Sequence, residues 1–253
     1  MVDAVVGFAE MVLLSAVMGF SIYLSLPMLL RKGVSKTKTK ALNAVAIGIL
    51  IFLIGDVFLD AAQYLYNGSL YNYGSSPFYD LVFAVSMCTG FAILLLAGHR
   101  GKMILTPSQL AMIIALGIGF QNLTEGLLFG SLGVTLGLTG AAVVVLVGFI
   151  FQNLTEGFPI ASPFLGDTNG KTSLIVGALF IGGFPTILGG AVGYYYSSIV
   201  FDLVFDGLAI GTMLYVIMPM LRNLLNESDT RRLGVAYLGV FIGFILGFIV
   251  NLV

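Results

Sequence analysis

Residues 120–126 and residues 151–157 of this chain both read FQNLTEG. Each copy lies in the middle of an apolar run, the first at about 107–131 and the second at about 138–164. A run of about 20 apolar residues can cross a bilayer as an α-helix, because each residue adds about 1.5 Å. We therefore predict two consecutive membrane-spanning helices that carry the same polar motif at mid-depth.

The rest of the chain is similarly apolar. Of its 253 residues, 58% are hydrophobic and only 9% are charged, against about 25% charged residues in an average soluble domain. The apolar runs lie at about 4–30, 41–66, 79–98, 107–131, 138–164, 172–194, 199–221 and 233–253. We predict an all-α, multi-pass protein of the cell membrane, with eight transmembrane helices in a single transmembrane domain that covers 1–253.

Every basic residue falls in an alternate connection between these runs. They are Arg31, Lys32, Lys36, Lys38 and Lys40 after the first run, Arg100 and Lys102 after the third, Lys171 after the fifth, and Arg222, Arg231 and Arg232 after the seventh. Short cytoplasmic loops are enriched in Lys and Arg. This pattern predicts that those four connections are cytoplasmic and that both termini are outside.

A weaker repeat extends the symmetry beyond the central pair. Residues 56–60 read DVFLD and residues 202–206 read DLVFD, in the second and seventh runs, which cross the membrane in opposite directions. We expect runs one to three to match runs six to eight around runs four and five, in a 3+2+3 inverted repeat. Transporters of this build bind their substrate near the midplane, where the repeats meet.

The repeated motif supplies oxygen ligands on one side of each helix. Gln121 and Glu125 are four residues apart, and so are Gln152 and Glu156, so each pair lies on one helix face. Asn122 and Asn153 follow the glutamines and are offset by about 100°. We expect the two asparagines to reach a neighbouring position, where they could bridge two adjacent ions.

Acidic residues inside the runs have no basic residue there to neutralise them. They are Glu10, Asp56, Asp60, Glu125, Glu156 and Asp206. A charged side chain at the bilayer centre costs several kcal/mol unless it is paired, protonated or hydrated. Bound cations or protons must therefore supply the positive charge, which favours cation transport.

The outer ends of the second and seventh runs are acidic. Asp56, Asp60, Asp202 and Asp206 would form a pathway vestibule that raises the local cation concentration. A solvated helix end explains Asp202 equally well, and a role outside transport explains Glu10 equally well. The amides of the motif could also simply bond helix to helix. Glycines at four-residue spacing in the eighth run favour packing within the chain, with a homodimer contact as the alternative.

The two motifs resemble the paired metal-binding helices of the ZIP divalent metal transporters, especially the GufA-like branch. There the fourth helix typically reads HNxPEG and the fifth QNxPEG, and the fold is a 3+2+3 bundle of eight helices with both termini outside. The resemblance implies a primary metal site at Gln121, Glu125, Gln152 and Glu156, and part of a second site at Asn122 and Asn153.

This chain departs from that pattern at several positions. Gln121 replaces the histidine of the fourth helix, Thr124 and Thr155 replace the prolines, and Thr186 replaces the glutamate of the second site. An all-oxygen site suits Mn²⁺, Fe²⁺ or Mg²⁺ better than a histidine site does. Zinc also fits, because carboxylates bind it.

Our first functional hypothesis is a ZIP-like importer of a divalent metal such as zinc, iron, manganese or cobalt, without a prosthetic group. Its partners would be the metal ions and the lipid bilayer, and not nucleic acid. A second hypothesis is a proton- or sodium-coupled transporter of a small organic solute, and a third is a metal sensor that does not transport. We expect no enzymatic activity, because the sequence has no phosphate loop and no nucleophile with a base at suitable spacing.

Overall fold

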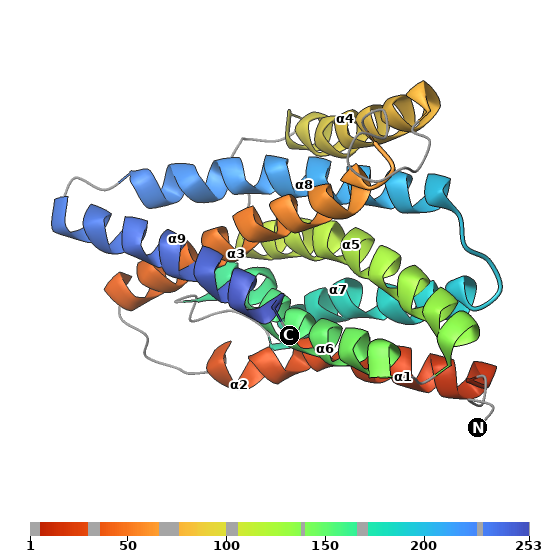
Figure 1. The fold of residues 1–253 in the computed structure, drawn as a ribbon. Helices are drawn as coiled ribbons and strands as arrows, with labels where there is room; N and C mark the ends of the chain where they lie inside the picture. The colour runs from red at the N-terminus through yellow and green to blue at the C-terminus, as the bar shows by residue number, and fades with distance from the viewer. Residues whose placement is uncertain are drawn as a thin grey trace.

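The computed structural model describes residues 6–29, 36–65, 76–99, 106–137, 140–165, 172–226 and 230–252. All regular structure in these ranges is helical (Figure 1). In chain order the elements are α1 (Phe8–Phe20), η1 (Ser21–Ser25), α2 (Leu26–Leu29), α3 (Lys36–Ala62), α4 (Pro77–His99), α5 (Pro107–Leu136), α6 (Gly140–Ala161), η2 (Ser162–Phe164), α7 (Thr172–Gly193), α8 (Ile199–Leu225) and α9 (Thr230–Val250).

Eight helical segments in the described residues are long and apolar enough to cross a membrane, which confirms the prediction of an all-α, multi-pass membrane protein. They are Phe8–Ser25, Thr37–Ala62, Pro77–Leu96, Pro107–Thr135, Ala142–Phe164, Thr172–Gly193, Ile199–Leu225 and Leu233–Val250. The predicted run ends at 4, 30, 66, 138 and 253 lie outside the described residues.

Three helices extend past the predicted runs and include basic residues. Helix α9 begins at Thr230 and therefore carries Arg231 and Arg232 in its first turn. Helix α3 begins at Lys36, and therefore carries Lys38 and Lys40 in its first turns, while α8 continues through Arg222 to Leu225. Lysine and arginine are tolerated at such helix ends because their long side chains reach the membrane interface. Arg31, Lys32, Arg100, Lys102 and Lys171 lie outside the described residues.

The packing of the spanning segments includes four parallel pairs, and in addition α5 packs on α8 and α1 on α7. The pairs α3–α9, α4–α8 and α5–α7 have the most extensive contacts. The fourth pair consists of α6 and the segment formed by α1 and η1. Here the Ser21 hydroxyl at the start of η1 donates to the carbonyl oxygen of Ile150 in α6 (3.1 Å). Close backbone approach needs small residues, and glycines lie at these contacts: Gly48, Gly239 and Gly243 in the first pair, Gly90, Gly207 and Gly211 in the second, and Gly126, Gly130, Gly189 and Gly193 in the third.

The direction of a pair follows from which residues meet. Gly239 lies against Ala44 of α3, whereas Gly247 lies against Phe52. Residue numbers therefore rise together along α3 and α9, and the two helices run parallel. Gly239, Gly243 and Gly247 of the eighth run thus pack within the chain, as the sequence favoured.

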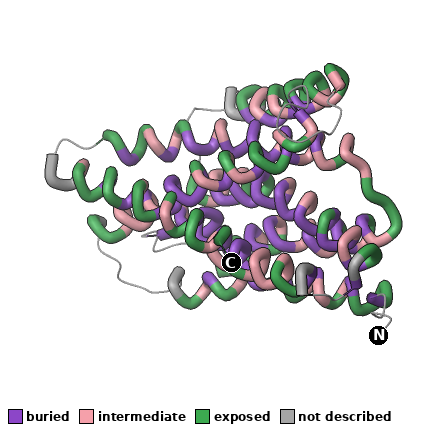
Figure 2. The backbone as a smooth tube through the Cα atoms, in the orientation of Figure 1, coloured by how far each residue is buried: buried purple, intermediate pink, exposed green. Residues whose placement is uncertain are grey.

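Burial separates central from peripheral helices. Buried residues concentrate in α5 and in the parts of α6, α7 and α8 that face it, whereas α4 and α9 are largely exposed (Figure 2). Exposed side chains of the outer helices are mainly apolar, including Leu81, Leu96 and Phe241. This is the expected pattern for a bundle whose outside faces lipid. It also places the polar motifs of α5 and α6 in the most protected part of the molecule.

Candidate functional site

The two motif helices meet through the Glu125 carboxylate. Its Oε1 atom accepts a hydrogen bond from the amide nitrogen of Gln121, four residues earlier on α5 (3.1 Å). The same atom accepts a shorter bond from the amide nitrogen of Gln152 on α6 (2.6 Å). Gln152 also donates to Oε1 of Glu156 (3.4 Å). Both carboxylates therefore share one amide, and the four residues form a single cluster.

The two asparagines form a second set of contacts between three helices. The Asn122 amide nitrogen donates to Oδ1 of Asn153 (2.8 Å) and to the carbonyl oxygen of Gly182 on α7 (3.0 Å). The Asn153 amide nitrogen donates to the carbonyl oxygen of Phe149, one turn earlier on α6 (3.0 Å). Asn122 therefore connects α5 to both α6 and α7, which is the helix-to-helix role considered for the amides.

The cluster is closed off from the surface. Glu125 is 6% exposed and Glu156 is fully buried, and both glutamines and both asparagines are buried as well. Several of their oxygen atoms have no hydrogen-bond partner: Gln121 Oε1, Asn122 Oδ1, Glu125 Oε2 and Glu156 Oε2. Buried polar atoms are almost always partnered in proteins. Four unpartnered acceptors in one cluster therefore indicate a place for a positively charged group or for water.

The glycine that ends each motif explains how the carboxylates are held. A Cβ atom at Gly126 would lie 2.9 Å from the backbone nitrogen of Gly190 and 3.0 Å from the Cα atom of Gly189, both on α7. A Cβ atom at Gly157 would lie 2.5 Å from the Ile22 carbonyl oxygen and 2.8 Å from Cβ of Ser25 in η1. Each glycine thus brings a neighbouring segment against the turn that bears the preceding glutamate.

Aspartates of α3 and α8 lie near the first motif. Asp56 and Asp60 are close enough to Glu125 for their charges to interact. Asp206 is buried beside Thr124 of the first motif and near Asp60 and Asp202. Asp60 is exposed and Asp202 is partly exposed. The four aspartates therefore extend from the surface towards the buried glutamates.

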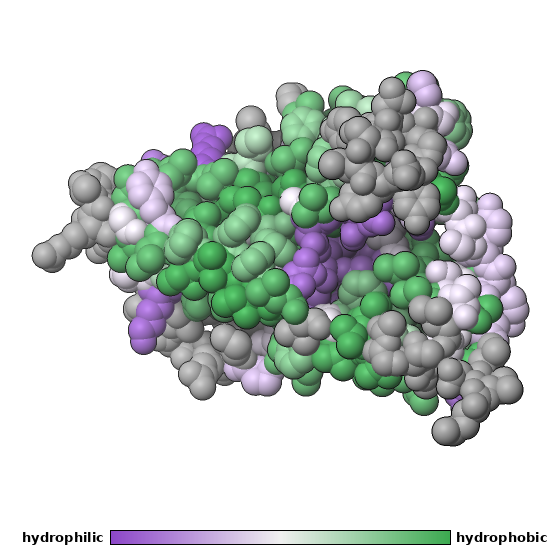
Figure 3. Space-filling model, viewed as in Figure 1, coloured by the Kyte–Doolittle hydropathy of each residue, from purple (hydrophilic) through white to green (hydrophobic). Residues whose placement is uncertain are grey.

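The C-terminal helix also contributes to this region. The amide nitrogen of Asn251 donates to Oδ1 of Asp56 (2.6 Å). On the face drawn in Figure 3, hydrophilic side chains gather in a hollow near the end of α9, and hydrophobic side chains border it. Some hydrophilic side chains are therefore exposed on this side of the bundle, although the cluster itself is buried.

Two residues weighed from the sequence have other surroundings. Glu10 is exposed, and its Oε2 atom accepts a hydrogen bond from the backbone nitrogen of Gly7 (3.0 Å). It therefore caps the start of α1 and lies outside the cluster. Thr186 is fully buried on α7, with an unpartnered hydroxyl, and its backbone lies against Gly126. It is uncharged and close to the first motif.

The donor set defines what the cluster could bind. It offers two carboxylates together with amide oxygens, which are ligands that Mg²⁺, Mn²⁺ and Fe²⁺ accept. Within the described residues, no three His, Cys, Asp or Glu side chains are close enough together to hold a metal ion by themselves. Any metal bound here would therefore need the amide oxygens as well as the carboxylates.

Sequence reasoning missed two contributors to the site. Asn251 is 195 positions from Asp56, and the Gly182 carbonyl is a backbone atom, so neither gives a signal in the sequence. Both contacts depend on how distant helices pack. No family model matches this chain, and no curated protein is similar enough to match it.

Proposed function

We propose that this protein carries a divalent metal cation across the cell membrane into the cytoplasm, through the Gln, Asn and Glu cluster between α5 and α6. The four unpartnered oxygen atoms of Gln121, Asn122, Glu125 and Glu156 carry this proposal. A buried carboxylate without a positive partner is strongly unfavourable in a membrane. A bound cation would satisfy both carboxylates and the amide oxygens at once.

The hydrogen bonds of the cluster suggest how a cation would enter it. The Oε1 atom of Glu125 accepts hydrogen bonds from the NH₂ groups of Gln121 and Gln152. These groups occupy positions at which the carboxylate would stabilise a bound cation. Rotation of either amide by about 180° exchanges its nitrogen for its oxygen. We infer that cation binding is accompanied by this rotation, which turns two hydrogen-bond donors into two ligands.

The acidic residues outside the cluster support entry of the cation from the end of the bundle opposite the lysines. Asp56, Asp60, Asp202 and Asp206 would attract cations towards Glu125. The basic residues of α3, α8 and α9 lie at the other ends of these helices. By the tendency of basic residues to remain cytoplasmic, we propose that the aspartates face outside, as do both termini.

The four parallel pairs support a 3+2+3 inverted repeat. If the first three spanning segments correspond to the last three, and α5 to α6, then the α3–α9 pair corresponds to α8–α4. Likewise the pairing of α1 and η1 with α6 corresponds to that of α7 with α5. Each of the four observed pairs therefore has a symmetry-related pair among the others. Together with the resemblance of the motifs, this symmetry favours membership of the ZIP family.

Metal flux into proteoliposomes tests the proposal. We expect uptake of at least one of Mn²⁺, Fe²⁺, Co²⁺ and Zn²⁺ by the purified protein, and loss of that uptake in the double variant Glu125→Gln, Glu156→Gln. The matched control is Glu10→Gln, which removes an acidic group that only caps α1. Uptake that survives the double variant would refute the assignment of the site. Solute uptake that needs a proton or sodium gradient but no metal would favour the organic-solute transporter instead.

A further inference from the structure

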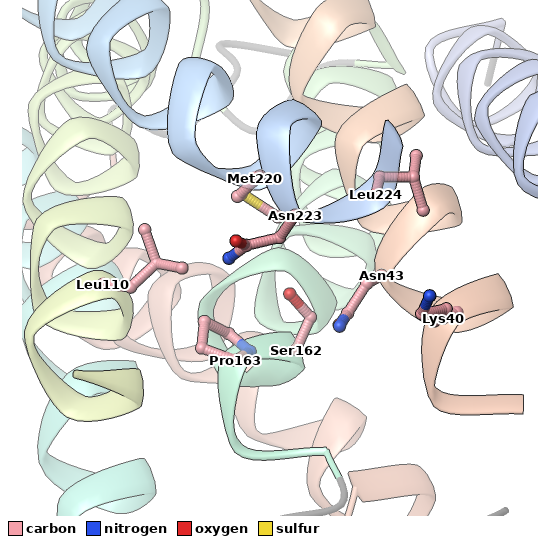
Figure 4. A pocket seen from close by; sticks show the side chains of 8 residues that line it. All are labelled: Lys40, Asn43, Leu110, Ser162, Pro163, Met220, Asn223 and Leu224. Carbon is pink, nitrogen blue, oxygen red and sulfur yellow. The ribbon is translucent and has the colours of Figure 1, made fainter. Parts of the chain in front are cut away.

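A cavity of about 180 Å³ lies at the basic end of the bundle, away from the glutamate cluster (Figure 4). It is formed by the first turns of α3 and α5, by η2 and by the last turns of α8. One ordered water needs only about 10–15 Å³ in a comparable measure. The cavity is therefore large enough for a group of several atoms.

Its polar lining suits an anion. Lys40, Asn43, Ser162 and Asn223 supply one ammonium group, two amides and one hydroxyl, and no Asp or Glu is among the described residues that line it. Figure 4 shows the amide groups of Asn43 and Asn223 and the Ser162 hydroxyl facing the same space, with Lys40 beside Asn43. Among the described lining residues, a divalent cation would meet a lysine and no carboxylate, which is the reverse of the glutamate cluster.

The floor and the rim of the cavity differ. Ser162 and Met220 are buried, whereas Asn223 is exposed, so the cavity opens at the end of the bundle. Leu110 and Met220 provide an apolar wall. A ligand with a charged head and an apolar remainder could place the head among the polar groups and leave the remainder outside.

Further basic residues are close to the lining residues in the sequence. Lys38 is two residues before Lys40 on α3, and Arg222 precedes Asn223 on α8. By the tendency of basic residues to remain cytoplasmic, this end faces the leaflet that holds anionic lipids. Basic pockets between transmembrane helices on that side are suited to phosphate-bearing headgroups.

We propose that this cavity binds a phosphate group, carried by an anionic phospholipid or free in the cytoplasm, with Lys40, Asn43 and Asn223 as its ligands. The Ser162 hydroxyl already donates to the carbonyl oxygen of Pro159 (3.0 Å), so it borders the site without donating to the phosphate. The bound phosphate links α3 and α8. Binding therefore stabilises the packing at the inner end of the bundle.

Thermal unfolding in a neutral detergent tests this site. The ligands are short-chain phosphatidylglycerol, short-chain phosphatidylcholine and inorganic phosphate, each titrated against the whole protein. We expect saturable stabilisation by phosphatidylglycerol and not by phosphatidylcholine. Equal protection by inorganic phosphate would assign the phosphate group alone as the ligand, and protection by the lipid only would assign the headgroup with its glycerol and chains.

Two variants and a control identify the ligands. Lys40→Met should weaken phosphatidylglycerol binding by about fivefold or more, since a lysine near an anionic lipid contributes about that much. Lys38→Met removes an exposed lysine that does not line the cavity. Because solvent and salt screen an exposed charge, this variant should keep the affinity within about twofold of the value for the unaltered protein. Asn223→Asp is nearly isosteric and places a negative charge in the cavity, so it should abolish the stabilisation.

Three outcomes would overturn the proposal: equal stabilisation by phosphatidylcholine, the same loss in Lys38→Met as in Lys40→Met, or full phosphatidylglycerol binding in Asn223→Asp. Stabilisation of Asn223→Asp by Mn²⁺ together with unchanged lipid binding would identify the cavity as a passage for cations. Because the readout is lipid-dependent stability, its result does not depend on whether the glutamate cluster transports metal.

Discussion

Replacement of Gly126 by alanine tests whether close packing of α5 against α7 holds the site together. The new Cβ atom would lie 2.9 Å from the Gly190 nitrogen and 3.0 Å from the Gly189 Cα atom, whereas ordinary contacts are 3.4–4 Å. The Thr186 carbonyl oxygen would be closer still, and all three neighbours are backbone atoms that cannot rotate away. The helices must therefore separate by about 1 Å or more to restore ordinary contacts. Overpacking of this kind destabilises a protein by about 1–3 kcal/mol.

Alanine also favours a helix over glycine by about 0.8–1.0 kcal/mol, so a matched control is needed. Gly177 lies on α7 with nothing within 4 Å of a Cβ atom at its position. Gly177→Ala has the same propensity gain without the clash. The difference in the free energy of unfolding between the two variants therefore measures the overpacking alone. We expect about 1–3 kcal/mol, or about 2–12 °C in Tm for a chain of this size.

Thermal unfolding followed by circular dichroism measures this difference, since the chain has no tryptophan for fluorescence. Metal uptake should also fall in Gly126→Ala and not in Gly177→Ala, because Glu125 directly precedes Gly126 and moves with the helix. Equal Tm values for the two variants would show that α5 and α7 are not in the close contact described here. Equal metal uptake by the two variants would show that transport does not depend on this helix packing.

Three further perturbations test the site by other routes. A transported metal at about 100 times its Kd should stabilise the protein by about 2.7 kcal/mol, which raises Tm by about 5–10 °C. The double variant Glu125→Gln, Glu156→Gln should lose this rise in Tm, and the control Glu10→Gln should keep it. Asn122→Leu removes hydrogen bonds to Asn153 and Gly182 and should lower the free energy of unfolding, measured by denaturant titration, by about 1–3 kcal/mol. The control is Gln63→Leu, which alters an exposed amide. If both variants change the free energy of unfolding equally, Asn122 does not hold the helices together. Asn251→Ala frees the Asp56 carboxylate, so the KM of metal uptake should fall by about two- to fivefold with Vmax unchanged; a higher KM would instead mean that Asn251 positions Asp56 for the ion.

The sequence predicted the helical architecture well, because crossing a membrane imposes a simple rule. Backbone groups in lipid must be bonded within their own helix, so each long apolar run becomes one helix regardless of its neighbours. The run at about 172–194 and the helix Thr172–Gly193 agree almost residue for residue. Helix ends were less predictable where lysines continue a helix into the interface, as at the start of α3.

The contrast between Glu10 and Glu156 marks the limit of the sequence. Both are acidic residues within apolar runs, and hydropathy alone cannot distinguish them. The tertiary structure makes Glu10 an exposed cap of α1 and Glu156 a fully buried member of the cluster. The difference arises because the end of a helix is solvated, whereas the middle of a central helix is surrounded by its neighbours.

The sequence by itself determined that this is a membrane bundle, that its basic residues alternate between connections, and that one polar motif occurs twice. These are local properties, set by composition and by spacing along a single helix. Only the tertiary structure decided which helices pair, which oxygen atoms remain unpartnered, and which glycines lie against a neighbouring backbone. Those properties depend on contacts between residues far apart in the chain, where side-chain volume and close packing, rather than hydropathy, determine what fits.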